Sequence, residues 1–150
     1  ILALASALRD WSFLIAGSVI HAPRTRPTTT NVRFLGVIDE ATKDALMGFA
    51  DLALNPMRSG SGTNLKMLDY MAAGVPTLTT ELGARGLGLE AGVHAICASR
   101  EGFEARMRGL DDQECSLLAG NARSHVERHF DWQGIANGVL AYWRNVGLIA

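Results

Sequence analysis

The sequence has few of the features that mark several large classes of protein. It contains two cysteines and four prolines in 150 residues, and aromatic residues make up 7% of the chain. Two cysteines, Cys97 and Cys115, are too few for the disulfide framework of a small secreted domain, so we expect both to be buried, reduced thiols. No apolar run approaches the ~20 residues that a bilayer-spanning helix requires. These absences leave cytoplasmic location as the default expectation.

An excess of charge of either sign is also missing. The formal net charge is −1, whereas a nucleic-acid-binding domain normally carries a basic patch or stripe, so we expect no nucleic-acid partner. With 48% hydrophobic residues the chain can build a proper core, since a chain of this length buries about 68–70% of the surface its unfolded form exposes. We expect a single domain over residues 1–150, in which residues 21–30 (HAPRTRPTTT) form the one linker-like loop.

Ligand patterns for metals and for serine hydrolases are likewise lacking. His125 and His129 stand at i, i+4 on an expected helix, but His21 and His94 lie far away in sequence and no third ligand is apparent. No serine occupies a Gly-x-Ser-x-Gly elbow. We therefore expect neither a bound metal nor Ser-His-Asp chemistry.

The most informative stretch that is present runs over residues 55–81. Residues 51–55 (DLALN) read as a short apolar strand, and Pro56 ends its ladder of hydrogen bonds. Gly60, Ser61 and Gly62 follow, and glycines let the backbone approach a bulky anion closely. This order of strand, glycine-rich turn and helix predicts a phosphate-binding βαβ unit.

The start of the next helix strengthens that interpretation. Thr63 or Asn64 can cap it, so that its free N–H groups and the positive end of its dipole face the loop. Lys66 lies in the first helical turn, where a cation is mildly unfavourable unless an anionic ligand offsets the repulsion, and Arg58 adds a second positive charge. Without a ligand, the same residues describe an ordinary surface loop with Lys66 as a solvated helix residue.

The helix itself has a recognisable pattern and a clear end. Leu65, Leu68 and Met71 are expected on its apolar face, with Asp69 on the flank that can reach the loop. Gly74 is expected to end it in the left-handed conformation, since Pro76 forbids its continuation.

These residues resemble a known family. The run GSGTNLKMLDYMAAGVPTLTT is similar to the nucleotide-sugar site in the C-terminal domain of GT-B glycosyltransferases of the group 1, or family 4, type. In that family two acidic residues stand eight positions apart, one near the donor sugar and one on the ribose. The resemblance places Asp69 at the ribose position and Ser61, a departure from the family's acid, at the sugar position. It further implies that Lys66 and the N–H groups of Gly62 and Thr63 hold the diphosphate.

The resemblance covers nearly the whole chain. Residues 3–9 read as a helix end, residues 11–17 and 31–37 as strands, and residues 42–50 as a helix. The loop that leaves the second of these strands, at Gly36 and Val37, lies near the base in relatives. Residues 126–144 resemble the family's closing helices, with Phe130 and Trp132 as anchors.

The expected fold is therefore α/β, a Rossmann-like parallel sheet with helices on both faces, as in the C-terminal half of a GT-B enzyme. Ligands of such sheets bind at the carboxyl ends of the strands, where Arg85 is also expected as a phosphate or interdomain contact or as a plain surface residue. The implied function is nucleotide-sugar binding in a retaining, hexosyltransferase-type glycosyltransferase that uses no metal. Its catalytic residues would be Lys66 and Arg58, and its donor-binding residues would be Gly60, Ser61, Gly62, Thr63, Asn64, Asp69, Gly36 and Val37.

The implied acceptor, a glycan or a lipid-linked molecule, would be bound by an N-terminal domain outside these residues, and the full-length protein would associate peripherally with a membrane. Residues 1–150 alone are expected to show no glycosyl transfer. In the resembled fold, an upstream strand lies between the strands at residues 11–17 and 51–55, so we expect a slot between these two.

Two other functions stay open. In a dinucleotide-binding Rossmann domain of an oxidoreductase, Gly60 and Gly62 would open the helix and Glu81 would bind the ribose, although Leu65 replaces the third glycine. The other alternative is a non-catalytic sugar- or partner-binding module, in which Ser61 marks lost activity.

Overall fold

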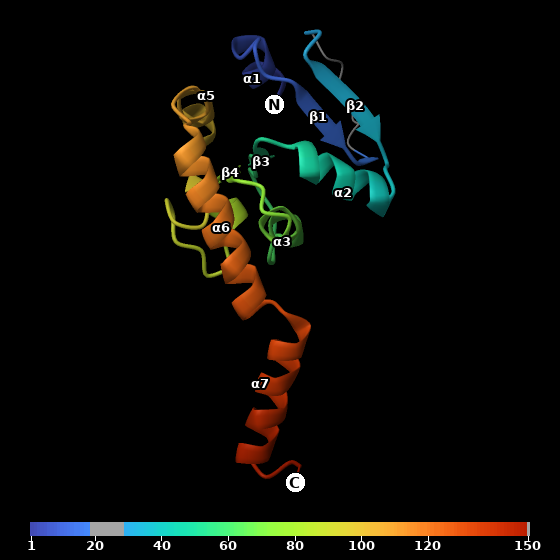
Figure 1. The fold of residues 1–150 in the computed structure, drawn as a ribbon, viewed down its shortest axis with the longest axis vertical. Helices are drawn as coiled ribbons and strands as arrows, with labels where there is room; N and C mark the ends of the chain where they lie inside the picture. The colour runs from blue at the N-terminus through green and yellow to red at the C-terminus, as the bar shows by residue number, and fades with distance from the viewer. Residues whose placement is uncertain (19–28, 150) are drawn as a thin grey trace.

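The computed structural model describes residues 1–18 and 29–149, and its elements alternate between helix and strand over much of the chain (Figure 1). In chain order they are α1 (Leu2–Ala7), β1 (Phe13–Ala16), β2 (Val32–Gly36), α2 (Glu40–Phe49), β3 (Ala53–Asn55), α3 (Leu65–Ala72), β4 (Thr77–Thr79), α4 (Glu81–Ala84), β5 (Ile96–Cys97), the 3-10 helix η2 (Arg100–Gly102), α5 (Phe103–Arg108), α6 (Asp112–His129) and α7 (Trp132–Asn145). Of the expected loop at residues 21–30, the part up to residue 28 lies outside the described residues.

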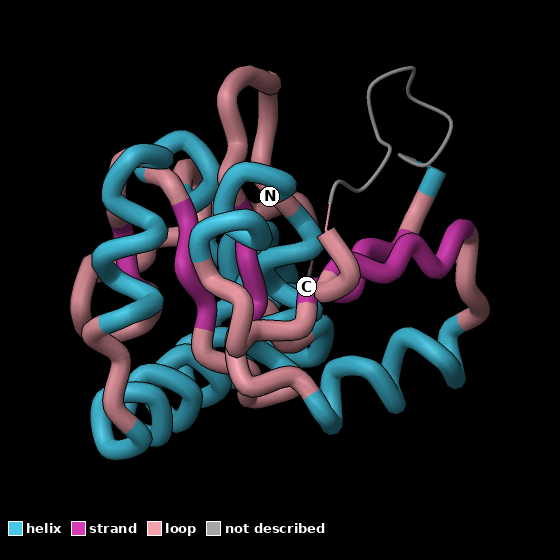
Figure 2. The backbone as a smooth tube through the Cα atoms, turned by 90° about the horizontal axis from the view of Figure 1, so that it is seen from above, coloured by secondary structure: helices cyan, strands magenta, loops and turns pink. Residues whose placement is uncertain are grey.

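All strand pairs are parallel, and they form two sheets. β1 pairs with β2, while β4 lies between β3 and β5. Figures 1 and 2 show the β1–β2 pair set to one side of the other three strands. The α/β class with parallel strands is thus confirmed, and each expected strand is found, with up to two residues missing at an end.

The β1–β2 sheet and the β3–β4–β5 sheet are separate. Within the described residues β1 and β3 do not pair. Ser12 and Asp51, which directly precede these strands, line one cavity of about 660 Å³ together with residues of the α5–α6 turn. The direct β1–β3 pairing that would have contradicted the expected slot is therefore not found in this part of the chain.

A single apolar cluster nevertheless joins both sheets. Phe13 and Val32 of the first sheet belong to the same buried group as Leu78 and Ile96 of the second. Phe103 of α5 is fully buried in that group. Burial of this kind stabilises a fold by about 25 cal/mol for each Å² of apolar surface removed from water, so this cluster couples the two sheets energetically.

The helix starts follow from short polar side chains. Asp39, Asp111 and Asp131 accept hydrogen bonds from backbone N–H groups at the starts of α2, α6 and α7. Because Asp39 provides the cap, α2 begins at Glu40, two residues before the expected start.

α3 ends as predicted, and its buried face matches the expected one only in part. Gly74 has a φ of 71°, and Val75 N–H donates to the Tyr70 carbonyl at 2.9 Å, which is the Schellman arrangement. The buried residues are Met67 and Met71, whereas the expected face member Leu65 is 70% exposed. Leu68 packs against the same cluster as expected, and Met67 is buried in place of Leu65 because it packs against Leu87 and Ala95, which are distant in sequence.

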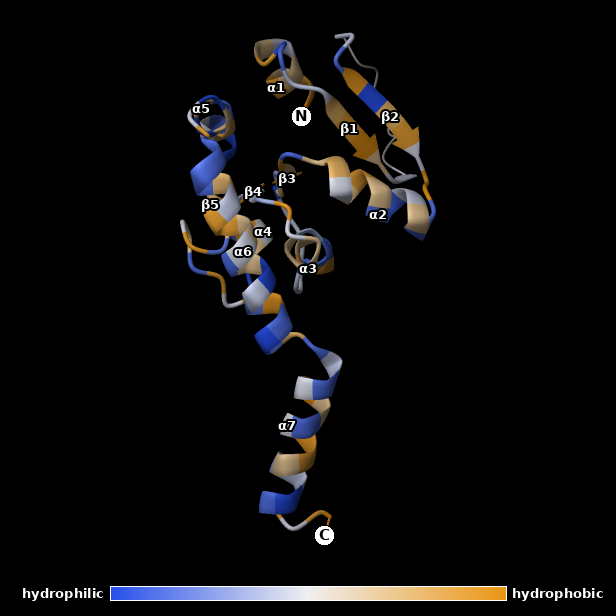
Figure 3. Ribbon diagram, viewed as in Figure 1, coloured by the Kyte–Doolittle hydropathy of each residue, from blue (hydrophilic) through white to orange (hydrophobic). Residues whose placement is uncertain are grey.

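The expectation that Trp132 anchors the C-terminal helices is wrong. Phe130 packs against the cluster around Met67, but Trp132 is 82% exposed. Figure 1 shows α7 extending away from the body, and Figure 3 shows apolar residues along it. In the described part of the chain, no helix combines the length and apolarity needed to cross a bilayer.

Candidate functional site

The candidate site lies where β3 and β4 end. β3 ends at Asn55, β4 ends at Thr79, and residues 56–64 lead from β3 into α3. Because β3 and β4 are parallel neighbours, their carboxyl ends share one edge of the sheet, the edge at which α/β folds bind ligands.

A buried amide fixes the base of this loop. Asn55 is 0% exposed, and its Nδ2 donates to the Thr79 hydroxyl at 3.1 Å. Its Oδ1 accepts from Nδ2 of Asn64 at 3.1 Å. The Thr80 hydroxyl donates to the Met57 carbonyl at 3.0 Å. Both ends of the loop are thereby tied to the strand ends.

This arrangement corrects the expected cap of α3. Asn64 occupies the position before the helix, but its side chain makes no cap bond to the helix; its Nδ2 donates instead to Oδ1 of Asn55. Thr63 lies against Gly86 instead: a Cβ on Gly86 would be 2.9 Å from the Thr63 hydroxyl oxygen. N–H groups of the first turn, at the positive end of the dipole, are left for a ligand.

The glycine turn, residues 60–63, is exposed, and two of its residues have backbone conformations that favour glycine. Gly60 and Gly62 have φ values of 144° and 81°. Ser61 and Thr63 are exposed. Arg85 donates from Nη2 to the carbonyls of Gly60 and Gly62, at 3.1 and 3.2 Å, a contact that the sequence did not indicate.

The two predicted cations both lie at the surface. Lys66 is exposed on the first turn of α3 and has no ion-pair partner among the described residues. Arg58 is also exposed. The pKa of Glu101 in η2 is lowered chiefly by hydrogen bonds from its own N–H and from Ser99, and the charge of Arg58 lowers it further. Lys66 therefore lies at the start of α3, while Arg58 lies toward η2.

Asp69 faces a lysine that the sequence did not indicate. Its carboxylate lies 3.7 Å from Nζ of Lys43 on α2. Lys43 also pairs with Glu40, which chiefly raises the pKa of Lys43, and Asp69 raises it further. The fold brings Lys43 and Asp69 together, although they are far apart in sequence.

Gly36 and Val37 lie at the carboxyl end of β2, in the other sheet. Gly36 has a φ of 73° and accepts from Gly17 N–H, while Val37 is 77% exposed. An exposed apolar side chain after a strand end is suited to contact with a flat base.

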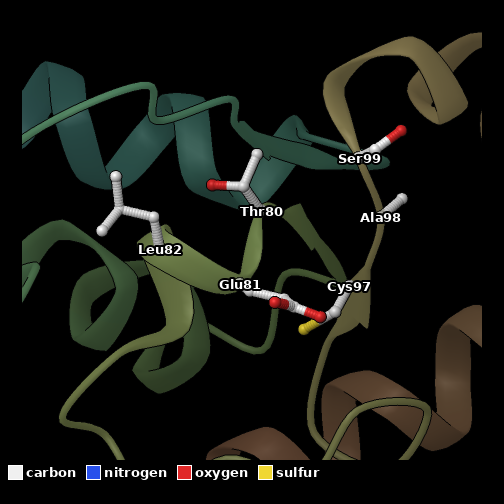
Figure 4. A pocket seen from close by; sticks show the side chains of 6 residues that line it. All are labelled: Thr80, Glu81, Leu82, Cys97, Ala98 and Ser99. Carbon is white, nitrogen blue, oxygen red and sulfur yellow. The ribbon is translucent and has the colours of Figure 1, made fainter.

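A cavity of about 420 Å³ opens at the neighbouring strand ends, lined by Thr80, Glu81, Leu82, Cys97, Ala98 and Ser99 (Figure 4). In Figure 4 the Glu81 carboxylate and the Cys97 sulfur lie close together. Burial, and then the charge of Glu81, raises the pKa of Cys97, so the thiol stays protonated and is a poor nucleophile. Cys97 and Cys115 are free thiols as expected, although both are half-buried and not fully buried.

Three histidines, His94, His125 and His129, form a cluster at α6. The His125 ring lies 4.5 Å from that of His94 and 4.7 Å from that of His129, between ring centres. His125 Nε2 donates to the Leu87 carbonyl, and His94 Nδ1 accepts from Glu90 N–H. No group of three or more His, Cys, Asp or Glu side chains arranged to hold a metal occurs in residues 1–18 and 29–149.

Comparison with known proteins gives a consistent result. Residues 1–111 match the family model described as Glycosyl transferases group 1. The phosphatidyl-myo-inositol mannosyltransferase of Mycolicibacterium smegmatis is 28% identical over 121 residues, which cover 77% of this chain and 31% of that protein. The protein of the same name from Mycobacterium leprae is 28% identical over 123 residues, covering 77% and 32%. The chain thus spans about a third of the length of these curated relatives.

Solved structures share the fold. Anabaena HepE in complex with UDP-glucose superposes with a TM-score of 0.72 and 20% identity, covering 92% of this chain and 44% of that one. A glycosyltransferase from Rickettsia africae gives a TM-score of 0.76 and 12% identity, covering 97% and 43%. At these identities the comparison establishes the fold alone.

Proposed function

Because this chain belongs to the group 1 glycosyl transferases, we propose that it is the nucleotide-sugar-binding domain of a retaining glycosyltransferase. The donor is a nucleoside diphosphate sugar, and no metal or other cofactor takes part. The acceptor is a glycan or a lipid-linked molecule held by a further domain of the longer protein.

One observation carries the proposal: the helix that follows the glycine turn has no side-chain cap, although a suitable residue stands in front of it. The Asn64 amide is held by the buried Asn55, so the end of α3 opens onto the exposed turn. A helix N-terminus favours an anion by about 0.3–1 kcal/mol, and up to ~2 kcal/mol in a partly buried geometry. Lys66 on that first turn adds a charge-assisted hydrogen bond to a phosphate, worth about 1.5–3 kcal/mol.

The reaction that these groups assist is departure of the diphosphate. As the bond between sugar and diphosphate breaks, negative charge grows on the leaving oxygen, and fixed donors aimed at that charge stabilise the transition state. Lys66 and the N–H groups of the turn act there, and Arg58 contributes long-range attraction. Since these groups are already in place, little reorganisation is needed when the charge develops.

Asp69 is proposed to bind the ribose hydroxyls, and Lys43 holds its carboxylate in the free protein. Gly36 and Val37 would border the base, and Ser61 would face the donor sugar with a neutral hydroxyl. The relatives' names support a hexosyl donor, since they are mannosyltransferases, and the HepE complex contains UDP-glucose. Phosphatidyl-myo-inositol in those names supports a lipid-linked acceptor and contact with a membrane surface.

The dinucleotide-binding alternative is disfavoured by the helix start. Its fingerprint needs a third glycine where helix and strand approach closely. Leu65 occupies that position and is 70% exposed, so no close approach occurs there. Glu81 begins α4 beside the cavity of Figure 4 and does not end β4.

The test is calorimetric titration of the full-length protein with UDP, GDP and a nicotinamide dinucleotide, followed by an assay of sugar transfer. Binding of UDP or GDP without binding of the dinucleotide supports the proposal. Tight dinucleotide binding would contradict it. Nucleotide-sugar binding without any turnover would support the non-catalytic module.

A further inference from the structure

Residues 85–86, in the segment that follows β4, contact the glycine turn. One nitrogen of Arg85, Nη2, donates to the carbonyl of Gly60 at 3.1 Å and to that of Gly62 at 3.2 Å. The adjoining Gly86 approaches so closely that a Cβ there would be 2.9 Å from the Thr63 hydroxyl. Side chain and backbone of residues 85–86 therefore both contact the turn.

The direction of these bonds determines where the turn's N–H groups point. In a trans peptide the C=O and N–H groups point in opposite directions, and no cis peptide occurs in the described residues. The Gly60 carbonyl shares its peptide with Ser61 N–H, and the Gly62 carbonyl shares its peptide with Thr63 N–H. Because both carbonyls converge on one Arg85 nitrogen, both N–H groups point away from Arg85, toward the same side.

These two N–H groups are available to a ligand. Neither the Ser61 nor the Thr63 N–H has a hydrogen-bond acceptor within the described part of the chain. The turn that carries them includes Gly60 and Gly62 at positive φ and is exposed. Glycines are the residues with the most backbone freedom to lose on ordering, so such a turn needs an external contact to hold one conformation.

We infer that Arg85 is a positioning residue that orders the glycine turn and aims the Ser61 and Thr63 N–H groups at the donor diphosphate. The inference rests on the proposed function, which it extends by a residue that does not itself contact the donor. Its mechanism is preorganisation. When only a fraction of the free protein has the competent turn, the apparent dissociation constant rises by the inverse of that fraction.

The experiment compares Arg85→Met, which keeps the aliphatic stem, with Arg85→Lys, whose ammonium retains three donors on one nitrogen. Arg123→Met is the matched control, since Arg123 is exposed on α6 and, among the described residues, pairs with Glu127 alone. In the full-length protein without ligand, ¹⁵N relaxation gives order parameters for residues 60–63. Calorimetry with UDP and GDP gives the affinity of each variant.

We expect Arg85→Met to lower these order parameters from about 0.85 toward 0.6 or less, the range of flexible backbone. Diphosphate affinity should fall roughly tenfold, the scale of a lost charged hydrogen bond. Arg85→Lys should restore most of both quantities, and Arg123→Met should change neither. Unchanged order parameters in Arg85→Met would overturn the inference, and a loss of affinity alone would make Arg85 a direct phosphate contact. If the wild-type protein binds neither UDP nor GDP, the proposed function fails, while the order parameters still test whether Arg85 orders the turn.

Discussion

The Nδ2 atom of Asn64 lies 3.1 Å from Oδ1 of Asn55, so the residue in front of α3 is bonded to the end of β3 and not to its own helix. Asn55 is fully buried and also donates to the Thr79 hydroxyl. One buried amide thus joins the two strand ends and the start of the helix. The position of the open helix end depends on this contact.

Replacing Asn55 by Ala should therefore destabilise the protein by about 2–4 kcal/mol, because the Asn64 amide and the Thr79 hydroxyl lose a buried partner. Urea unfolding measures the change. Asn137→Ala is the control, since Asn137 lies on the exposed α7 and bonds only to Gln133. It should stay within about 0.5 kcal/mol of wild type. An equal effect of both substitutions would show that the Asn55 contacts do not matter for stability.

A pair of glycine substitutions tests the packing around the same amide. Gly83 lies in α4 without positive φ, yet a Cβ there would be 2.3 Å from the Thr79 hydroxyl oxygen and 2.5 Å from Asn55 Nδ2. Gly138 in α7 has no neighbour within 4 Å of such a Cβ. Gly83→Ala should cost about 1–3 kcal/mol through overpacking, whereas Gly138→Ala should stabilise by roughly 0.5–1 kcal/mol through helix propensity. Thermal unfolding distinguishes the two signs, and stabilisation by Gly83→Ala would refute the close packing.

Asp69→Asn tests the ribose assignment. The substitution should reduce discrimination between ribose and 2′-deoxyribose nucleotides more than it reduces diphosphate affinity, because the proposed partner of Asp69 is the ribose. Competition titrations with the two nucleotides measure the ratio. Lys43→Met, which removes the cation 3.7 Å from Asp69, shows how much of any effect comes from that ion pair. Equal losses for both nucleotides would make Asp69 a structural residue.

His94 should make stability depend on pH. Burial, and next the charge of His125, lowers the pKa of His94 below its ordinary value of 6.5, with smaller lowering by Arg128 and His129 and an opposing effect of Glu90. The unfolded chain therefore takes up this proton at a higher pH than the folded chain does. The contribution to stability is complete above pH 6.5 and is lost as the pH falls from 6.5 toward the lower pKa of the folded state.

His94→Asn keeps an acceptor for Glu90 N–H, which bonds to His94 Nδ1 at 3.0 Å, but cannot be protonated. We expect urea unfolding between about pH 8 and pH 5.5 to show a smaller loss of stability in this variant than in wild type. An identical pH dependence in the two proteins would exclude His94 as its source.

Local patterns were sufficient to predict much of the fold. The strand ending at Asn55, the glycine turn and the left-handed Gly74 depend on residues that are neighbours in sequence, and each is found. Local propensity also indicated Asn64 as a cap, but a partner nine positions away in sequence takes its amide. A cap is a weak local preference, and a buried carboxamide that would otherwise lack a partner outweighs it.

Contacts distant in sequence could not be predicted in this way. Arg85 and Gly60 are 25 positions apart, and a glycine-rich segment such as ELGARGL contains no signal that its arginine turns toward backbone carbonyls. Lys43 of α2 comes near Asp69 of α3 only in the folded chain. A family resemblance suggests which residues meet a ligand, but not which residues hold them in place.

The most direct test of the proposed function is calorimetric titration of the full-length protein with UDP and GDP, in wild type and in Lys66→Ala. We predict that wild type binds one of them and that Lys66→Ala weakens binding by about 1.5–3 kcal/mol. Its unfolding free energy should stay within about 0.5 kcal/mol of wild type, because Lys66 is exposed. Arg123→Ala, which removes an exposed cation of α6, should leave the affinity unchanged. Failure of wild type to bind either diphosphate, or equal affinity of wild type and Lys66→Ala, would contradict the assignment of this loop and helix end as a nucleotide-sugar site.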